Sequence, residues 1–152
     1  MSDRLFVLDT NIVLALVRGG QLGTYLDQTF GLRAAKERPL ISLVTHGEIR
    51  VLAHRNSWGE KKLAVLEIAL NNLVTIDINH LAVLDAYVEI DLYSQKHPDG
   101  SRNMGKNDLW IAACAKAAGA ILLTTDQDFD HLSPELLEVE RVDPDAGKDR
   151  NA

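Results

Sequence analysis

Four carboxylates stand where apolar segments of the chain give way to polar ones. They are Asp9, Glu48, Asp108 and Asp126. Carboxylates that converge on one place repel each other strongly, so their pKa values rise or a cation must bind between them. A cluster of oxygen ligands with no cysteine and no obvious histidine suits Mg²⁺ or Mn²⁺ better than zinc. These four residues are therefore the candidates for a metal site.

Each of the four acids also has a purely structural interpretation. Asp9 can cap a turn, and Glu48 can complete a capping box at a helix start. Asp108 can complement the dipole of a helix capped by Asn107, and Asp126 can make a turn. Singly, each structural interpretation is the better one, but four separate caps have no reason to share one edge of a sheet. The residue pattern alone leaves both interpretations open.

Short, continuously apolar runs predict the strands that must position these acids. They are residues 5–8, 40–44 and 120–124. An alternating pattern predicts a further short strand at 73–77, and residues 137–142 are a weaker candidate. Helical patterns lie between them, at residues 12–18, 21–37, 45–55, 57–71, 80–96 and 107–118. Apolar strands that alternate with helices favour a parallel sheet covered on both faces. Ligands of such sheets bind at the carboxyl ends of the strands, and all four acids map to that edge.

Several polar residues are expected to begin these helices. Thr45-His46-Gly47-Glu48 and Ser57-Trp58-Gly59-Glu60 both have the form of a capping box, and Asn107 is expected to cap the helix at 107–118. The predicted capping box places Glu48 in the first turn of its helix.

Composition bounds the class of protein. The chain has 152 residues, one cysteine, and a net charge of −6 from 22 acidic and 16 basic side chains. This length suits one domain, expected at residues 1–142, followed by a polar and flexible tail at 143–152. One cysteine fits a reducing compartment, so we expect a cytoplasmic protein. The apolar start of the chain is too short for a signal peptide, and no apolar run is long enough to cross a membrane.

The acidic balance speaks against a surface that attracts nucleic acid everywhere. Without the four candidate ligands, however, 18 acidic side chains face 16 basic ones, a net charge of only −2. The acidic excess therefore reflects the candidate site and leaves a nucleic-acid partner open.

Four segments occur in an informative order: Phe6-Val7-Leu8-Asp9-Thr10-Asn11, Ile41-Ser42-Leu43-Val44-Thr45-His46-Gly47-Glu48, Gly105-Lys106-Asn107-Asp108-Leu109-Trp110-Ile111-Ala112-Ala113 and Leu123-Thr124-Thr125-Asp126-Gln127-Asp128-Phe129. Together they resemble the PIN-domain ribonucleases and, within them, the toxin ribonucleases of the VapC type. An Asp-Thr-Asn triplet is a weak signal, whereas the third and fourth segments in succession are specific. In the family pattern the metal-binding acids fall on Asp9, Glu48, Asp108 and Asp126.

The resemblance implies a PIN-like three-layer α/β/α sandwich with a central, mainly parallel sheet. It implies a Mg²⁺- or Mn²⁺-dependent endoribonuclease that forms a homodimer and is the toxin of a type II toxin–antitoxin pair, inhibited by a small antitoxin. The reaction would be hydrolysis of an RNA phosphodiester by in-line attack of water, with one or two metal ions. Asp9 and Asp108 are expected to hold the principal ion, Glu48 to orient water, and Asp126 to complete the negative pocket or support a second ion.

Further polar residues are expected to support the acids or the RNA. Side chains that could fix the carboxylates by hydrogen bonds are Thr10, Asn11, Asn107 and Thr124. Thr10 and Asn107 serve equally well as helix caps. Side chains that could contact RNA phosphates are Arg102, Lys106 and, in a locally basic stretch at 33–62, Arg50. Asp128 is expected to be a solvated turn acid rather than an outer ligand.

Two other functions compete with the nuclease. A phosphatase of the haloacid-dehalogenase kind also begins with an Asp at a strand end, but it needs a second Asp where Asn11 stands. A metal-binding or partner-binding module could keep the fold without cleaving RNA. Partner surfaces are also open, because the apolar stripe Leu81, Leu84, Val88 and Leu92 suits a dimer seam as readily as the core.

Overall fold

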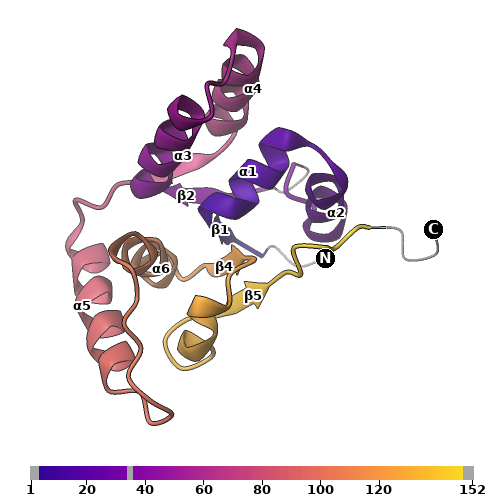
Figure 1. Cartoon of the computed structure of the whole chain (residues 1–152). Coiled ribbons are helices and arrows are strands. Elements are labelled where there is room, and N and C mark those ends of the chain that lie inside the picture. Colours follow the sequence, from indigo (N-terminus) through magenta and orange to yellow (C-terminus); the bar gives the residue numbers. More distant parts are fainter. Residues whose placement is uncertain (1–3, 34–35, 149–152) are drawn as a thin grey trace.

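A five-stranded, fully parallel sheet forms the centre of the protein (Figure 1), in a computed structural model that describes residues 4–33 and 36–148. The strands lie in the order β3-β2-β1-β4-β5. Their bounds are β1 Phe6–Leu8, β2 Leu40–Ser42, β3 Val74–Ile76, β4 Ile121–Thr124 and β5 Val139–Arg141. The predicted parallel sheet is confirmed, and each segment predicted as a strand contains one of these strands.

Both faces of the sheet are buried, which explains why the central strands are apolar throughout. In β1, Phe6 and Leu8 belong to one apolar core, while Val7 between them belongs to a second core. In β4, Leu123 and Leu122 divide in the same way. Because successive side chains of a strand point to opposite faces, a strand covered on both sides needs an unbroken apolar run.

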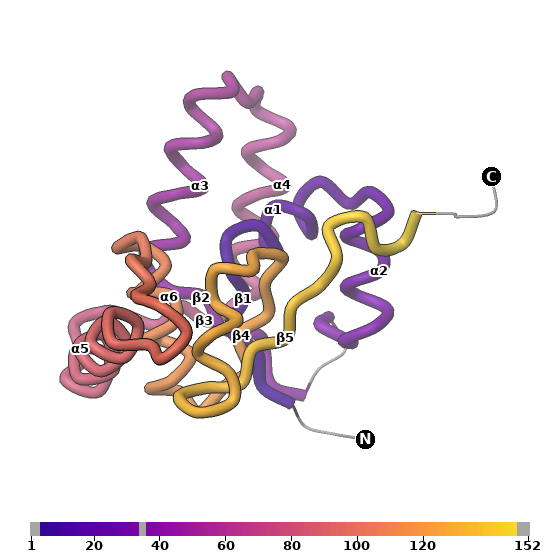
Figure 2. The backbone as a smooth tube through the Cα atoms, turned by 60° about the horizontal axis from the view of Figure 1, so that its bottom comes forward, coloured from indigo at the N-terminus to yellow at the C-terminus, as the bar shows by residue number. Residues whose placement is uncertain are grey.

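Helices cover the two faces and complete three layers (Figures 1 and 2). The core on one face includes residues of α1 (Thr10–Arg18), α2 (Gln21–Phe30) and α4 (Glu60–Asn71). The core on the other face includes residues of α5 (Leu81–Gln95) and α6 (Lys106–Ala118). Helix α3 (Leu43–Arg55) runs beside α4, and the two project from the sheet as a hairpin.

Two predicted helix starts are wrong by a few residues, and both errors concern the site. Helix α3 begins at Leu43 because Ser42 caps it, its Oγ accepting a hydrogen bond from the Val44 N–H at 3.1 Å. The predicted capping box is therefore not formed, and Glu48 lies in the second turn. Helix α6 begins at Lys106 after Gly105, so Asn107 is its second residue and not its cap.

Two other helix boundaries also differ from the prediction. The helix predicted at 21–37 ends at Phe30, because Gly31 adopts a left-handed conformation with φ 61° that closes it. Residues 34–35 of that prediction lie outside the described residues. Helix α4 begins after Gly59 rather than with Ser57 as its cap.

Helix α5 turns its predicted apolar stripe outward. Leu81 is 79% exposed, and Leu84, Val88 and Leu92 are exposed by 45–49%. The buried face instead carries Val83, Ala86, Ile90 and Ser94. The three apolar residues of this face belong to the same core as the buried residues of α6, so this face, and not the predicted stripe, packs in the interior.

The chain after β5 returns along the first helices. Ala146 packs against the core that contains α1 and α2, and a Cβ at Gly147 would lie 2.6 Å from the Gln21 carbonyl oxygen. The start of the predicted tail is thus in contact with the domain, while residues 149–152 lie outside the described residues. The domain boundary at 142 stays a prediction. Among the helices described, none is both long and apolar enough to cross a membrane.

Candidate metal centre

The acids gather at the point where the order of the strands reverses direction. From β1 the sheet extends to β2 on one side and to β4 on the other, and such a point opens a crevice at the carboxyl ends of the strands. Asp9 follows β1 directly, and Asp126 lies just after the neighbouring β4. The first turn of α6 brings Asp108 to the same edge, and α3, which leaves the neighbouring β2, brings Glu48.

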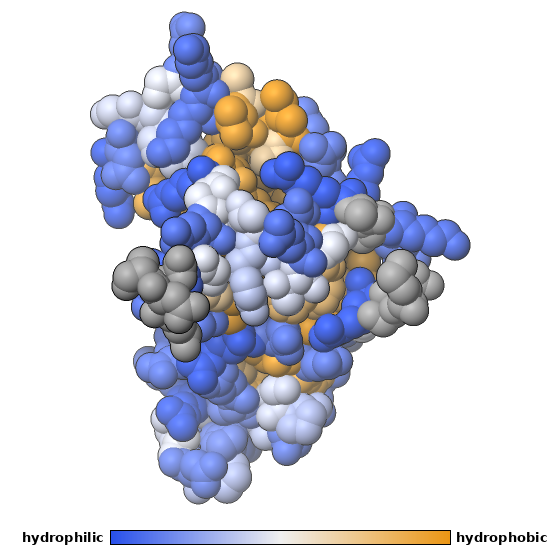
Figure 3. Space-filling model, turned by 90° about the vertical axis from the view of Figure 1, so that its right-hand side faces the viewer, coloured by the Kyte–Doolittle hydropathy of each residue, from blue (hydrophilic) through white to orange (hydrophobic). Residues whose placement is uncertain are grey.

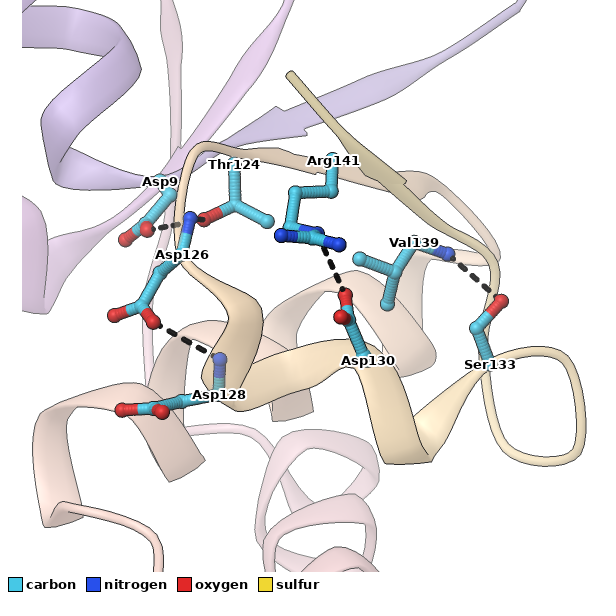
Figure 4. A network of polar contacts seen from close by, with 8 residues as sticks. All are labelled: Asp9, Thr124, Asp126, Asp128, Asp130, Ser133, Val139 and Arg141. Atoms are coloured by element: carbon cyan, nitrogen blue, oxygen red, sulfur yellow. Dashed lines mark hydrogen bonds and ion pairs between the residues drawn. The ribbon is translucent and has the colours of Figure 1, made fainter. Parts of the chain in front are cut away.

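Asp9 is almost completely buried, with 5% of its surface exposed, and hydrogen bonds fix its carboxylate. As the N-cap of α1, it accepts a hydrogen bond from the Thr10 N–H on Oδ1 at 2.8 Å. Its Oδ2 accepts the Thr124 hydroxyl at 2.7 Å (Figure 4). Burial raises the pKa of Asp9, opposed by these two hydrogen bonds and reinforced by the charges of Glu48 and Asp126.

Thr124 connects the two acids that leave adjacent strands. Its side chain is completely buried, and its hydroxyl donates to Asp9 while accepting the Asp126 N–H at 2.9 Å (Figure 4). One hydroxyl therefore fixes both the rotamer of Asp9 and the turn that carries Asp126.

The hydroxyls of Thr10 and Thr45 orient Glu48. The Thr10 hydroxyl donates to Glu48 Oε1 at 2.7 Å and lies 3.2 Å from the hydroxyl of the fully buried Thr45. Because Thr10 has only one hydroxyl proton, Thr45 is the donor in that second contact. Thr45, predicted as a helix cap, instead supports the acid cluster from the first turn of α3. It is a supporting residue that the sequence reasoning missed.

Asp108 carries the clearest electrostatic signature of the cluster. Its pKa rises to about 6, first through burial and then through the negative charges of Asp9, Asp126, Glu48 and Asp128. In the described part of the chain its carboxylate has no hydrogen-bonding or ion-pairing partner. The four acids predicted from the sequence therefore lie close enough together for Asp108 to respond to the other three.

Asp128 joins the cluster, although it was predicted to be only a solvated turn acid. Asp108, Asp126 and Asp128 each present a carboxylate oxygen within 4.8 Å of those of the other two. Asp126 caps the 3-10 helix η1 (Gln127–Leu132), and its Oδ1 accepts the Asp128 N–H at 2.9 Å. This turn directs the Asp128 side chain to the same side as Asp126 and Asp9 (Figure 4). The sequence signal was the Asp-x-Asp spacing directly after a strand.

The other predicted site residues divide into near and distant ones. Neither Asn107 nor Asn11 makes a side-chain hydrogen bond within the described ranges, so the predicted hydrogen bonds from these two residues to the carboxylates are not formed. Asn107 lines a hollow together with Glu48, and Asn11 lines another hollow. Arg102 is exposed on the segment that leads into α6, and Lys106 is the exposed first residue of α6. Arg50 instead pairs with Glu67 of α4 at 2.8 Å, which holds its guanidinium on the α3–α4 hairpin.

The donor set fits a hard divalent cation. All the converging ligand atoms are carboxylate oxygens, the preference of Mg²⁺ and Mn²⁺. Burial and, after it, mutual repulsion raise the pKa values of Asp9 and Asp108, and a bound cation would offset both effects. The hydroxyls of Thr10, Thr45 and Thr124 supply the supporting hydrogen bonds that hold metal-binding carboxylates in place.

The chain is similar to known proteins in both sequence and structure. The profile of the PIN domain family matches residues 6–133. A protein named ribonuclease VapC2, from Haemophilus influenzae, is 28% identical over 130 residues that cover 84% of this chain and 91% of that protein. Among solved structures, VapBC2 from Rickettsia felis bound to a promoter DNA fragment is similar with a TM-score of 0.70 and 24% identity, covering 90% of this chain and 98% of that one. DNA-bound VapBC from Salmonella typhimurium gives 0.73 and 22%, covering 91% and 98%. At these identities the two structures establish a shared fold.

Proposed function

The chain belongs to the PIN-domain family, and from this premise we propose that it is a Mg²⁺- or Mn²⁺-dependent endoribonuclease, the toxin of a type II toxin–antitoxin pair. The observation that carries the proposal is the convergence of acids at the strand-order reversal, where Asp108, Asp126 and Asp128 present oxygens within 4.8 Å of one another. The raised pKa of Asp108, caused by burial and by its acidic neighbours, supports it. The relative named as a ribonuclease supports the choice of RNA as substrate.

The acids would hold the cation and present it to a phosphodiester. Asp108, Asp126 and Asp128 offer three oxygens close together. The charge of Asp9 acts on Asp108, and hydrogen bonds fix both Asp9 carboxylate oxygens. When bound, a divalent cation supplies a more acidic water and offsets the negative charge that grows on the phosphoryl oxygens.

Glu48 is the side chain best placed to orient the attacking water. Thr10 fixes its Oε1, and its Oε2 accepts no hydrogen bond from the described residues. Attack of the water oxygen on phosphorus breaks the bond to the leaving sugar oxygen, which takes up a proton. The exposed Lys106, two residues before Asp108, would contact a neighbouring phosphate.

The proposal is tested by incubating the purified chain with structured RNA, with and without Mg²⁺ and EDTA. Cleavage that requires Mg²⁺, stops with EDTA and is lost in Asp9→Asn supports the nuclease. The matched control is Asp85→Asn, because Asp85 is exposed on α5 and lies outside the acid cluster. A folded protein that binds Mg²⁺ or a partner but leaves RNA intact would instead be a binding module. The haloacid-dehalogenase alternative lacks its second acid, since Asn11 occupies that position.

As a toxin, the protein would form a homodimer, bind a small antitoxin and act on RNA in the cytoplasm. Similar solved structures include VapBC-5 from Mycobacterium tuberculosis, a member of the VapBC family of toxin–antitoxin systems, and a toxin–antitoxin complex from Klebsiella pneumoniae. Apolar side chains gather over the projecting α3–α4 hairpin (Figure 3), where the exposed members are Val51, Leu63, Val65 and Ile68. Growth arrest on expression, relieved by co-expression of the product of an adjacent reading frame, would support the toxin role. Unimpaired growth with active enzyme would indicate a housekeeping nuclease.

A further inference from the structure

A hollow of about 450 Å³ lies directly beside the acid cluster. Its volume falls within the roughly 300–1,000 Å³ of small-ligand sites. One wall is the extended segment that precedes α6, and the other is η1. The polar residues that line it from these two walls are Ser101, Arg102, Asn103, Gln127, Asp128, Asp130 and His131.

Asp128 belongs to both the hollow and the acid cluster. One of its carboxylate oxygens lies within 4.8 Å of an oxygen of Asp108 and of Asp126, and the same residue lines the hollow. If one phosphate of a nucleic-acid ligand lies at the acid cluster, the nucleotide attached to that phosphate would therefore extend into the hollow.

The charges in the hollow favour an anionic group at one end. Asp130 also lines it, but its carboxylate pairs with Arg141 at 3.2 Å and turns away from Asp128 (Figure 4). Arg102 makes no ion pair with any described residue. The unneutralised cation of Arg102 suits the phosphate that follows the one at the acids along a nucleic-acid strand.

Uncharged polar groups line the space between these two ends. The side chains of Ser101, Asn103 and Gln127 make no hydrogen bond within residues 4–33 and 36–148. Each amide presents a donor and an acceptor side by side, the pattern that the edge of an unpaired base matches.

A buried serine ties the two walls together. The Ser94 hydroxyl, which is completely buried, lies 2.8 Å from His131 Nε2 on η1 and 3.4 Å from the Met104 sulfur on the opposite wall. The Ser94 carbonyl accepts the Arg102 N–H at 2.7 Å. The ring of His97 meets that of His131 edge to face, with centroids 5.6 Å apart. These contacts preform the hollow, which lowers the cost of ordering it around a ligand.

We propose that this hollow is a nucleotide subsite, which holds the base and ribose of the single-stranded RNA nucleotide next to the scissile phosphate. Asn103 and Gln127 contact the edge of the base, and Arg102 contacts the following phosphate. The proposal rests on the proposed nuclease function, and it makes these three residues determinants of the cleavage sequence.

Binding without cleavage tests the subsite on its own. The ¹⁵N-labelled chain is titrated, with Mg²⁺ present, with each of the four ribonucleoside 5′-monophosphates, which contain no phosphodiester to cleave, and separately with inorganic phosphate. Nucleotides should shift the side-chain amide signals of Asn103 and Gln127, with at least one base preferred. Asn103→Ala should weaken that nucleotide about tenfold, as expected for loss of a base contact. Asn71→Ala, on exposed α4 surface, is the matched control and should change nothing.

The outcomes separate the subsite from the nuclease. Equal shifts with inorganic phosphate, or nucleotide shifts confined to other parts of the protein, overturn the subsite. Nucleotide shifts in the hollow without RNA cleavage retain the subsite and reject the proposed function. In the active enzyme, the double variant Asn103→Ala, Gln127→Ala should lower kcat/KM about tenfold for the preferred sequence and flatten the preference at one position. If the double variant cleaves RNA with the same sequence preference as the wild type, the subsite proposal is overturned.

Discussion

Replacing Asp108 with asparagine should stabilise the metal-free protein at neutral pH. The Asp108 carboxylate has four acidic neighbours and no hydrogen bond or ion pair from the described residues, so its negative charge is opposed but not compensated. Asparagine has nearly the same shape and no charge, and it forfeits no hydrogen bond found there. The cost of burying the charge and the repulsion by its neighbours, which together raise the pKa of Asp108, are therefore removed at little structural cost.

The size of this effect follows from the pKa. A rise from 3.8 to about 6 corresponds to about 3 kcal/mol at most, because one pKa unit is about 1.4 kcal/mol. The side chain is only partly buried and solvent screens its interactions, which reduces the expected gain to about 1–2 kcal/mol. For a domain of this size, that gain raises Tm by about 2–8 °C.

The stability that Asp108→Asn gains over the wild type should increase with pH. The folded state holds the Asp108 proton more tightly than the unfolded state, so the wild type loses stability as pH rises from about 4 to 6. Below pH 4 the two proteins should therefore melt alike, and above about pH 6 the full difference should appear. Added Mg²⁺ should reverse the order, since a ligand that binds the folded wild type stabilises it more than a variant with a weakened site.

The assay is thermal unfolding followed by circular dichroism, in EDTA from pH 4 to 8, and then in Mg²⁺. Asp85→Asn is the control, because an exposed carboxylate outside the cluster should change stability by less than about 0.5 kcal/mol. An Asp108→Asn protein that is equally stable or less stable than the wild type at pH 7.5 in EDTA would refute the idea that burial and the neighbouring acids destabilise the charged Asp108 carboxylate.

Three further outcomes follow from the same geometry. Thr124→Val removes the hydroxyl that joins Asp9 to the Asp126 turn, so calorimetric titration should show Mn²⁺ affinity about 10–100-fold lower, and unchanged affinity would exclude the supporting role. Mn²⁺ affinity of the wild type should fall as pH drops below about 6, where the raised pKa of Asp108 leaves its carboxyl protonated, and a flat profile from pH 7 to 5 would contradict this. Lys106→Ala should weaken RNA binding for all sequences alike and reduce the slope of log affinity against log salt by about 1, whereas an unaltered slope would place Lys106 away from the RNA.

The fold was largely predictable because the strongest signals are short-range. Runs such as residues 120–124 are apolar on both faces and bounded by polar residues, which favours a buried parallel strand. Once such strands are placed in one sheet, Asp9 and Asp126 must lie at the same edge. The convergence of the four predicted acids is a consequence of topology, and topology follows here from the alternation of strands with helices.

The remaining features depend on contacts between distant residues or on competition between neighbours. Ser42 and Thr45 can each cap a helix, and only packing decided that Ser42 does so and that Thr45 meets Thr10 across the site. Asp128 joins the cluster through a turn set by the Asp126 side chain. The stripe headed by Leu81 shows amphipathic spacing, but spacing does not say which face meets α6.

The central claim is that the acid cluster binds the cation with which the protein cleaves RNA. The most direct measurement is the rate at which the Asp108→Asn variant cleaves a labelled structured RNA in Mg²⁺, beside Asp85→Asn and the wild type. With folding verified by circular dichroism, we expect the Asp108→Asn rate to fall at least about 100-fold, as for loss of an essential electrostatic group, while Asp85→Asn retains the wild-type rate. A folded Asp108→Asn protein that cleaves the RNA at the wild-type rate would contradict the claim.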